Sequence, residues 1–292
     1  MFMTKFTDQP FTEAEIQGKV LSLMYHNVVA DGADLSELSP SATSYFVTAS
    51  QFRAHLKRMQ SHQVLNLSDL CSQESSSEEP EKTVLHLTFD DGWAGSFELA
   101  AELLEEYNMQ ATVFVTTGLI DSKWFVSRDQ LKQFPNQRLQ IGSHTVTHRF
   151  LMLLSNEELK AELVDSKHLL EDLCQVPIET ISIPHGAIDA RVREAVFDAG
   201  YSEIFTSRPG LNAFPQSTHQ WRRVAIGWST TEETLQRYLE GHLLKERLKA
   251  RVLSIPKKVL GREGYHKVRS LLLGEQTEEK DMLELISEQS NN

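Results

Sequence analysis

Cysteine is scarce in this sequence: the 292-residue chain contains only Cys71 and Cys174. Two cysteines cannot form the disulfide framework of a small secreted domain, and no Cys-x-x-Cys metal motif is present. The two could pair with each other, but the sequence favours two reduced thiols, as in a cytosolic protein.

Long apolar stretches are also absent. No run of about 18 apolar residues occurs, so the sequence predicts no transmembrane helix. The N-terminal sequence MFMTKFTDQPFTEAEIQGKV does not combine a basic stretch with an apolar one, so it predicts no signal peptide. We therefore expect a cytoplasmic location.

Positive charge is in deficit, with 29 basic against 41 acidic residues and a net charge of −12. This balance argues against non-specific binding to nucleic acid or to anionic membranes. The remaining composition, 40% hydrophobic and 24% charged, is ordinary for a soluble globular protein. The length allows one barrel-sized α/β domain or two smaller domains.

Short apolar strands alternate with amphipathic helices along most of the chain. We expect strands over residues 19–25, 83–89, 111–116, 139–142, 179–183 and 201–206, and helices over 49–63, 96–107, 155–174 and 189–200. The helix over 155–174 is the clearest, because leucines recur on one face and Ser155-x-x-Glu158 is a capping box. This alternation predicts βαβ units and a parallel sheet.

Two polar segments interrupt or follow this pattern. Residues 72–82 are rich in serine and glutamate and predict a solvated loop, and residues 274–292 form an acidic tail. From about residue 230 the chain becomes mainly helical and more basic. Leu248, Val252, Ile255 and Val259 are spaced as one helical face, which we expect to pack on the main domain; weak contact with an anionic membrane surface is the alternative.

Four polar clusters follow expected strands. They are His26, the pair Asp90-Asp91, the pair His144 and His148, and the turn Pro184-His185-Gly186. In parallel α/β folds the carboxyl ends of the strands form one face, which carries the active site in barrels. Each cluster alone has an ordinary interpretation as a turn, a surface pair or a structural histidine, but together they predict a site.

The chemistry of this set is that of an open metal site. Two imidazoles four residues apart and one carboxylate can hold a divalent ion such as zinc and leave a position for water. Such an ion lowers the pKa of its water to roughly 7, and a second carboxylate acting as base contributes roughly 10²–10⁴-fold. Adjacent residues of a strand point to opposite sides, so Asp90 and Asp91 can divide these two tasks. Gly92 permits a close turn beside them.

The stretches LTFDDGW, SHTVTH and SIPHGAID resemble the NodB-homology polysaccharide deacetylases. LMYHNV and TASQFRAHLKRM resemble the branch that works on surface polysaccharides and exopolysaccharides, and the likeness covers roughly residues 21–226. The resemblance implies an α/β fold, an incomplete or distorted (β/α) barrel. It makes Asp90 the general base and Asp91, His144 and His148 the metal ligands, most simply for Zn²⁺. The implied reaction is hydrolysis of the N-acetyl group of an amino sugar.

The sequence departs from the family pattern beside the base. Many members have arginine two residues before the proline of the third motif, where this chain has Ser182. Arg223, in WRRVAI, resembles an arginine found late in the surface-polysaccharide branch and is predicted to supply the missing charge. Arg222 is the competing candidate.

The general acid is the second departure, because no clear match to the family's last motif is present. His26 ranks first, since it ends a strand on the expected active face; the other candidates are His185, His219 and His242. For the substrate we predict contacts from Trp93, Pro184, His185 and Gly186.

The resemblance divides the chain into a deacetylase barrel over 1–229 and a helical C-terminal extension with an acidic tail over 230–292. The expected partner is an N-acylated amino sugar or oligosaccharide, not nucleic acid. A cytoplasmic location favours a nucleotide-activated sugar, a lipid-linked precursor or another small N-acyl substrate. The alternatives are a deformylase or other C–N amide hydrolase, and a carbohydrate-binding homologue without turnover.

Overall fold

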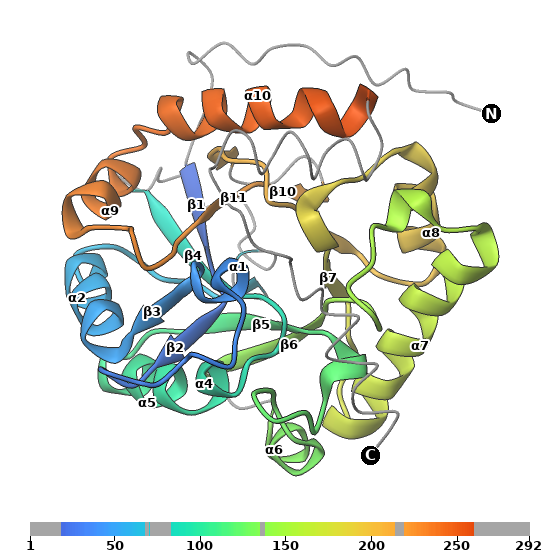
Figure 1. Cartoon of the computed structure of the whole chain (residues 1–292), viewed down its shortest axis with the longest axis horizontal. Coiled ribbons are helices and arrows are strands. Elements are labelled where there is room, and N and C mark those ends of the chain that lie inside the picture. Colours follow the sequence, from blue (N-terminus) through green and yellow to red (C-terminus); the bar gives the residue numbers. More distant parts are fainter. Residues whose placement is uncertain (1–18, 68–69, 71–82, 135–137, 214–218, 260–292) are drawn as a thin grey trace.

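The computed structural model describes residues 19–67, 70, 83–134, 138–213 and 219–259 (Figure 1). The main sheet has the strand order β10-β8-β7-β6-β5-β4-β1-β11, and each neighbouring pair in this order is parallel. The strands are β1 (Lys19–Tyr25), β4 (Val84–Phe89), β5 (Ala111–Val115), β6 (Leu139–Ser143), β7 (Thr180–Ser182), β8 (Glu203–Phe205), β10 (Gln220–Trp221) and β11 (Arg223–Ala225).

The sheet curls into a nearly closed barrel. β10 and β11 lie at opposite ends of the strand order but are separated in sequence only by Arg222, so the two edges of the sheet lie next to each other. β9 (Asn212–Ala213) adds an antiparallel pairing to β1, and β2 (Asn27–Val29) pairs with β3 (Phe46–Thr48) in a separate small sheet. The predicted α/β barrel is confirmed.

Helices cover the outside of this sheet (Figure 1). They are α1 (Pro40–Thr43), α2 (Ala49–Met59), α4 (Ala94–Phe97), α5 (Leu99–Glu106), α6 (Arg128–Gln133), α7 (Asn156–Cys174), α8 (Ala190–Asp198), α9 (Glu232–Leu239) and α10 (Leu244–Val259), with short 3-10 turns at η1 (Thr117–Leu119), η2 (Leu151–Leu153) and η3 (Pro184–Gly186). Each expected helix is present, although the one expected over 96–107 begins at Ala94 and breaks at Glu98 into α4 and α5.

Helix α7 follows the sequence pattern closely. Leu159, Leu163 and Leu170 are at most 1% exposed and pack in the main core, where burial of each contributes about 1.5–3 kcal/mol. Ser155 is the N-cap, and the reciprocal bonds of the capping box with Glu158 are both present. The helix is therefore fixed at its start and along one face, so it can hold a neighbouring loop in place.

The C-terminal part is partly described. Leu235 and Leu239 of α9 belong to the same core cluster as the barrel strands. Leu248 of α10, which we expected to pack on the main domain, is 52% exposed. The rest of its predicted face, like the loop 72–82 and the acidic tail, lies outside the side chains and residues described, and the boundary at residue 229 stays a prediction.

The structure describes one of the two cysteines and most of the chain that was searched for a membrane-spanning helix. Cys174 is a free, buried thiol whose pKa burial raises to about 11, while Cys71 lies outside the described residues. Within the described part of the chain, no helix combines the length and the apolar character needed to cross a membrane.

Candidate active site

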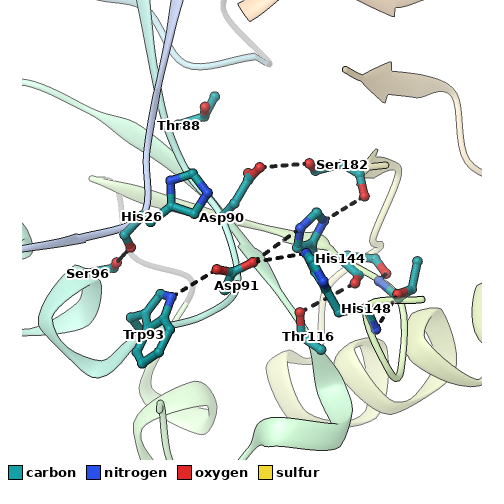
Figure 2. Close-up of polar contacts among 12 residues, drawn as sticks. His26, Thr88, Asp90, Asp91, Trp93, Ser96, Thr116, His144, His148 and Ser182 are labelled. Atoms are coloured by element: carbon teal, nitrogen blue, oxygen red, sulfur yellow. Dashed lines mark hydrogen bonds and ion pairs between the residues drawn. The ribbon is translucent and has the colours of Figure 1, made fainter. Parts of the chain in front are cut away.

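Side chains from five barrel strands meet at one place, four of them at the carboxyl ends of their strands. Asp90 and Asp91 follow β4, His144 follows β6, and His26 follows β1 (Figure 2). Ser182 closes β7, and Arg223 opens β11 on the far side of β1. The sequence prediction that these separate stretches converge is therefore correct.

Asp91 lies between the two predicted histidine ligands. Its Oδ1 is 3.3 Å from Nε2 of His144 and 3.5 Å from Nε2 of His148 (Figure 2). One ligand atom from each residue lies within 4.8 Å of the others, and Asp91 and His144 are buried. For a tetrahedral ion with bonds of about 2.0–2.1 Å, neighbouring ligand atoms are about 3.3–3.4 Å apart. The spacing around Asp91 therefore fits a divalent ion.

The tautomer of His144 gives an independent test of that fit. Its Nδ1 lies 2.7 Å from the carbonyl oxygen of Ser182, and because a carbonyl only accepts, Nδ1 carries the proton. In a neutral ring, the lone pair of Nε2 then faces the Asp91 carboxylate. Two acceptors at 3.3 Å repel unless the ring is protonated or a cation lies between them. A bound cation satisfies both groups.

The pKa values point the same way. Burial lowers the pKa of His144, but the negative charges of Asp90 and Asp91 outweigh it and the pKa is raised. Burial raises the pKa of Asp91, but His144, His148 and His26 outweigh it and the pKa is well below its usual range. The surroundings therefore favour a positive charge next to an ionised Asp91.

The backbone turns sharply at the ligands. Asp91 has φ 75° and Gly92 has φ 84°, so the two carboxylates diverge through a left-handed turn and not, as we expected, through the alternation of a strand. Thr145 and His148 also have positive φ, at 68° and 56°. His144 and His148 therefore belong to a strained loop, which excludes the interpretation of H-x-x-x-H as two residues of one helix.

Glu162 of α7, which the sequence analysis did not single out, holds this loop. One oxygen of its buried carboxylate accepts hydrogen bonds from the backbone nitrogens of Val146 and Thr147, at 2.8 and 2.9 Å, and the other accepts from the Thr147 hydroxyl. One turn along, Ser166 accepts from Ser143. The helix thus fixes the segment between the two histidines. Short sequence patterns such as the capping box do not identify Glu162, because its carboxylate accepts hydrogen bonds from a loop outside its own helix.

Replacing Glu162 with glutamine is expected to lower the affinity for Zn²⁺ about 10–100-fold, the usual cost of losing a group that orients ligands. The amide keeps the length but has one acceptor oxygen where the carboxylate has two. Competition with a chromophoric chelator measures this affinity directly. Asp165→Asn, an exposed acid-to-amide change on the same helix, is the matched control. Equal zinc affinity of the Glu162 variant and the control would show that the loop holds its shape without the carboxylate.

Asp90 has entirely different partners. Nη1 of Arg223 donates to Oδ1 at 2.6 Å, Nη2 donates to Oδ2 at 2.7 Å, and Ser182 donates to Oδ2 at 3.1 Å. Burial raises the pKa of Asp90, but the charge of Arg223 and then of His144 outweigh it, so the pKa lies below its usual range. Asp90 is therefore an ionised carboxylate beside the metal triad, as a base requires.

Arg223 is saturated by this arrangement. Besides the two bonds to Asp90, it donates to Thr88, Ser182 and the carbonyl of Thr206, which uses all five N–H groups of the guanidinium. The rings of Phe114 and Phe205 lie 5.4 and 5.8 Å from it. The side chain is 1% exposed. The charge that the Ser182 position lacks is thus supplied from β11.

Arg222 does not reach this cluster. Its backbone exchanges two hydrogen bonds with the Asn212 side chain, and its side chain contacts Gly210. Alternation along the strand places neighbours on opposite faces, which separates Arg222 from Arg223. Of the two candidates, the geometry selects Arg223 as the partner of Asp90.

The four candidate acid histidines lie in different places. His26 is half-buried beside both carboxylates (Figure 2); desolvation of its ring lowers its pKa, and the charges of Asp91 and Asp90 partly oppose this. His185 lies on the other side, with its ring 4.8 Å from that of His148. His219 and His242 have side chains 68% and 70% exposed and pair with Glu203 and Glu240. Only His26 lies next to Asp90 and Asp91.

Two of the residues predicted to contact the substrate, Trp93 and His185, interact with other protein side chains in the structure. Trp93 is 1% exposed, and its Nε1 donates to Oδ2 of Asp91 at 3.0 Å (Figure 2). The indole therefore orients the carboxylate of Asp91, the predicted metal ligand. His185 has φ 59° and stacks on Phe150, with ring centroids 3.7 Å apart. Pro184 and Gly186 are buried in the same 3-10 turn. The substrate-binding roles of these residues stay predictions.

Comparisons with known proteins agree with this site. A family model described as polysaccharide deacetylase matches residues 77–204, a span that includes Asp90, Asp91, His144 and His148. The provisionally assigned polysaccharide deacetylase YxkH of Bacillus subtilis is 26% identical over 230 residues, covering 78% of each chain. Chitin deacetylase 1 of Cryptococcus neoformans var. grubii is 31% identical over 178 residues, which cover 58% of this chain but only 37% of the fungal protein.

Solved structures show the same fold. The Streptococcus pyogenes deacetylase PplD in complex with acetate superposes with a TM-score of 0.65 at 24% identity, covering 76% of this chain and 98% of that one. IcaB from Ammonifex degensii superposes with a TM-score of 0.62 at 18% identity, covering 76% of this chain and 96% of that one. At these identities the likeness concerns the barrel and not the substrate.

Proposed function

The chain is a member of the NodB-type polysaccharide deacetylase family, and from this premise we propose that it is a metal-dependent hydrolase that removes the N-acetyl group from an amino-sugar unit. One observation carries the proposal: two adjacent carboxylates have separate sets of partners. Asp91 faces two imidazoles, while Asp90 is paired with Arg223. A binding protein without turnover has no need of an ionised base beside a metal triad.

The residues divide the reaction as follows. A divalent ion held by Asp91, His144 and His148 would supply a water of lowered pKa and polarise the amide carbonyl. Asp90, kept ionised by Arg223, accepts the proton of the attacking water. We assign the delivery of a proton to the leaving amine to His26, the candidate histidine that lies beside both carboxylates. We propose Zn²⁺ as the ion, because two imidazole nitrogens and one carboxylate oxygen are a ligand set that catalytic zinc sites use.

The proposed substrate unit is N-acetylglucosamine. The names of two relatives contain it: a peptidoglycan-N-acetylglucosamine deacetylase and a poly-beta-1,6-N-acetyl-D-glucosamine N-deacetylase. The curated relatives differ in the glycan that carries this unit, so the glycan is not transferred to this chain. The cytoplasmic location also stays a prediction, which fractionation of cells that produce the native protein would check.

The test is a panel of N-acylated substrates with the zinc-loaded protein. N-acetyl and N-formyl forms of the same glucosamine oligosaccharides are compared by the carboxylic acid they release. Acetate release that exceeds formate release supports the deacetylase. The opposite order would make the protein a deformylase, and release of neither acid, from oligosaccharides or from UDP-N-acetylglucosamine, would favour the carbohydrate-binding homologue.

A further inference from the structure

The described surface carries one unusually exposed aromatic ring. Trp228 is 65% exposed, whereas Trp93 and Trp221 are each 1% exposed. It is the most exposed tryptophan or phenylalanine of the described residues. A single exposed apolar side chain is common on protein surfaces and needs no explanation by itself. Its place relative to the active site decides whether it has a function.

The strand register puts the backbone of Trp228 close to the level of His26, beyond the carboxyl end of β11. β11 runs parallel to β1 with Met24 opposite Ala225, so Gly227 comes level with His26. A Cβ at Gly227 would lie only 2.4 Å from the carbonyl oxygen of Ser44. Glycine is therefore required for the chain to pass so close to this loop. Trp228 is the next residue.

The loop that Gly227 touches also contacts His26. The ring of Tyr45 packs against the ring of His26 in a tilted arrangement, with centroids 4.6 Å apart and an angle of 32° between the planes. The Cα of Tyr45 would lie 3.4 Å from a Cβ at Gly227. Trp228 therefore follows directly from the residue that packs against Tyr45, on the side of the site where His26 lies.

The segment that presents Trp228 is held firmly. Its backbone nitrogen donates to the carbonyl of Ser44 at 3.3 Å, and its carbonyl accepts from Nε2 of Gln51 at 3.1 Å. The nitrogen of Gly227 donates to the hydroxyl of Thr230 at 3.1 Å. A ring on a fixed backbone costs less entropy to use in binding than one on a loose loop.

We propose that the exposed ring of Trp228 forms a second subsite that binds a sugar ring adjacent to the one being deacetylated. The negative face of an aromatic ring attracts the polarised C–H groups of a pyranose face, and an indole offers the largest such face. This inference rests on the proposed function and deepens it, because it selects an oligosaccharide over a single activated sugar as the substrate class.

The charges around the subsite favour an uncharged sugar over a nucleotide diphosphate. Helix α9 starts shortly after Trp228 with Glu232 and Glu233 in its first turn. Of the nearby guanidinium groups, that of Arg58 pairs with Glu232, with Nε and Oε2 3.0 Å apart, and that of Arg223 has every N–H already bonded. A diphosphate in this region would meet the carboxylate of Glu233 and would have to compete with Glu232 for Arg58, whereas a neutral sugar meets neither obstacle.

The experiment compares Trp228→Ala, Trp228→Phe and the wild type on N-acetylglucosamine oligosaccharides of two to five units, with both β-1,4 and β-1,6 linkages. For the tetrasaccharide of the preferred linkage we expect Trp228→Ala to raise KM about threefold to tenfold, the range of a lost aromatic contact, with a smaller rise for the disaccharide. Trp228→Phe should recover most of the loss. Phe197→Ala, which removes an exposed ring from α8, is the control.

Binding is measured separately from turnover, so that the two proposals can fail independently. Indole fluorescence is titrated with the tetrasaccharides in the Asp90→Asn background. A blue shift that disappears with Trp228→Ala supports the subsite even if no acetate is ever released. A KM effect that is equal for all chain lengths, or a titration with UDP-N-acetylglucosamine that depends on Trp228 more strongly than the tetrasaccharide titration does, would overturn it.

Discussion

Asp90→Asn is expected to lower kcat for acetate release by roughly 10²–10⁴-fold, the usual contribution of a general base, while the protein still binds one equivalent of zinc. The amide cannot accept the proton of the attacking water. It still offers an oxygen to the Arg223 guanidinium, which also keeps Thr88, Ser182 and Thr206 as acceptors. Kinetics at saturating substrate together with metal analysis check this prediction.

The adjacent Asp91→Asn provides the matched comparison, since the two changes are chemically identical and one residue apart. It should lose zinc affinity, because it removes the carboxylate that faces His144 and His148. Thermal unfolding of both variants ensures that the assays use folded protein. If Asp90→Asn kept full activity, or lost zinc as Asp91→Asn does, the division of labour between the two carboxylates would be wrong.

Arg223→Met is expected to destabilise the fold by about 3–5 kcal/mol, since it leaves the carboxylate of Asp90 buried without its cation. The pKa of Asp90 should rise, because the largest influence that remains is burial. In the wild type the lowered pKa adds stability above the pKa of the unfolded chain, and this is lost as the pH falls through the folded value. The stability difference should therefore shrink on acidification, and the acid limb of kcat/KM should move to higher pH.

The double variant Arg223→Met/Asp90→Asn tests the cause of that loss. Removing the uncompensated charge should recover a large part of the stability, although not the activity. Arg222→Met is the control, because that neighbouring arginine contacts Gly210 and does not reach Asp90. Chemical denaturation at several pH values gives the free energy of unfolding of the wild type, of the two Arg223 variants and of the control. A double variant no more stable than Arg223→Met would show that packing, and not the buried charge, is responsible.

The sequence predicted the barrel and the grouping of Asp91, His144 and His148, because both depend on local patterns. Each motif stands directly after a strand, and parallel strands bring their carboxyl ends together whatever the loops do. Leu159, Leu163 and Leu170 likewise lie on one face of α7 as their spacing requires. Helix boundaries were less certain, since the break at Glu98 leaves no signal in the apolar pattern.

The residues that hold the site in place were harder to find. Glu162 lies in the middle of a helix and serves a loop that precedes that helix, so no short pattern connects the two. Arg223 and Arg222 are indistinguishable until the register of β11 is known. Trp93, which was predicted to contact the substrate, is 1% exposed and stacks on Phe125, with ring centroids 4.2 Å apart. The position of each of these side chains depends on contacts with residues distant in sequence, or on which face of a strand the residue occupies.

We propose that one divalent ion at Asp91, His144 and His148 drives deacetylation, and removal and return of that ion are the most direct test. Acetate release from an N-acetylglucosamine tetrasaccharide is measured on one sample as purified, after exhaustive chelation, and after stepwise addition of Zn²⁺. We predict that activity disappears with the metal and returns in proportion to zinc, saturating at one equivalent per chain. Activity that is unchanged in the chelated protein would contradict the account.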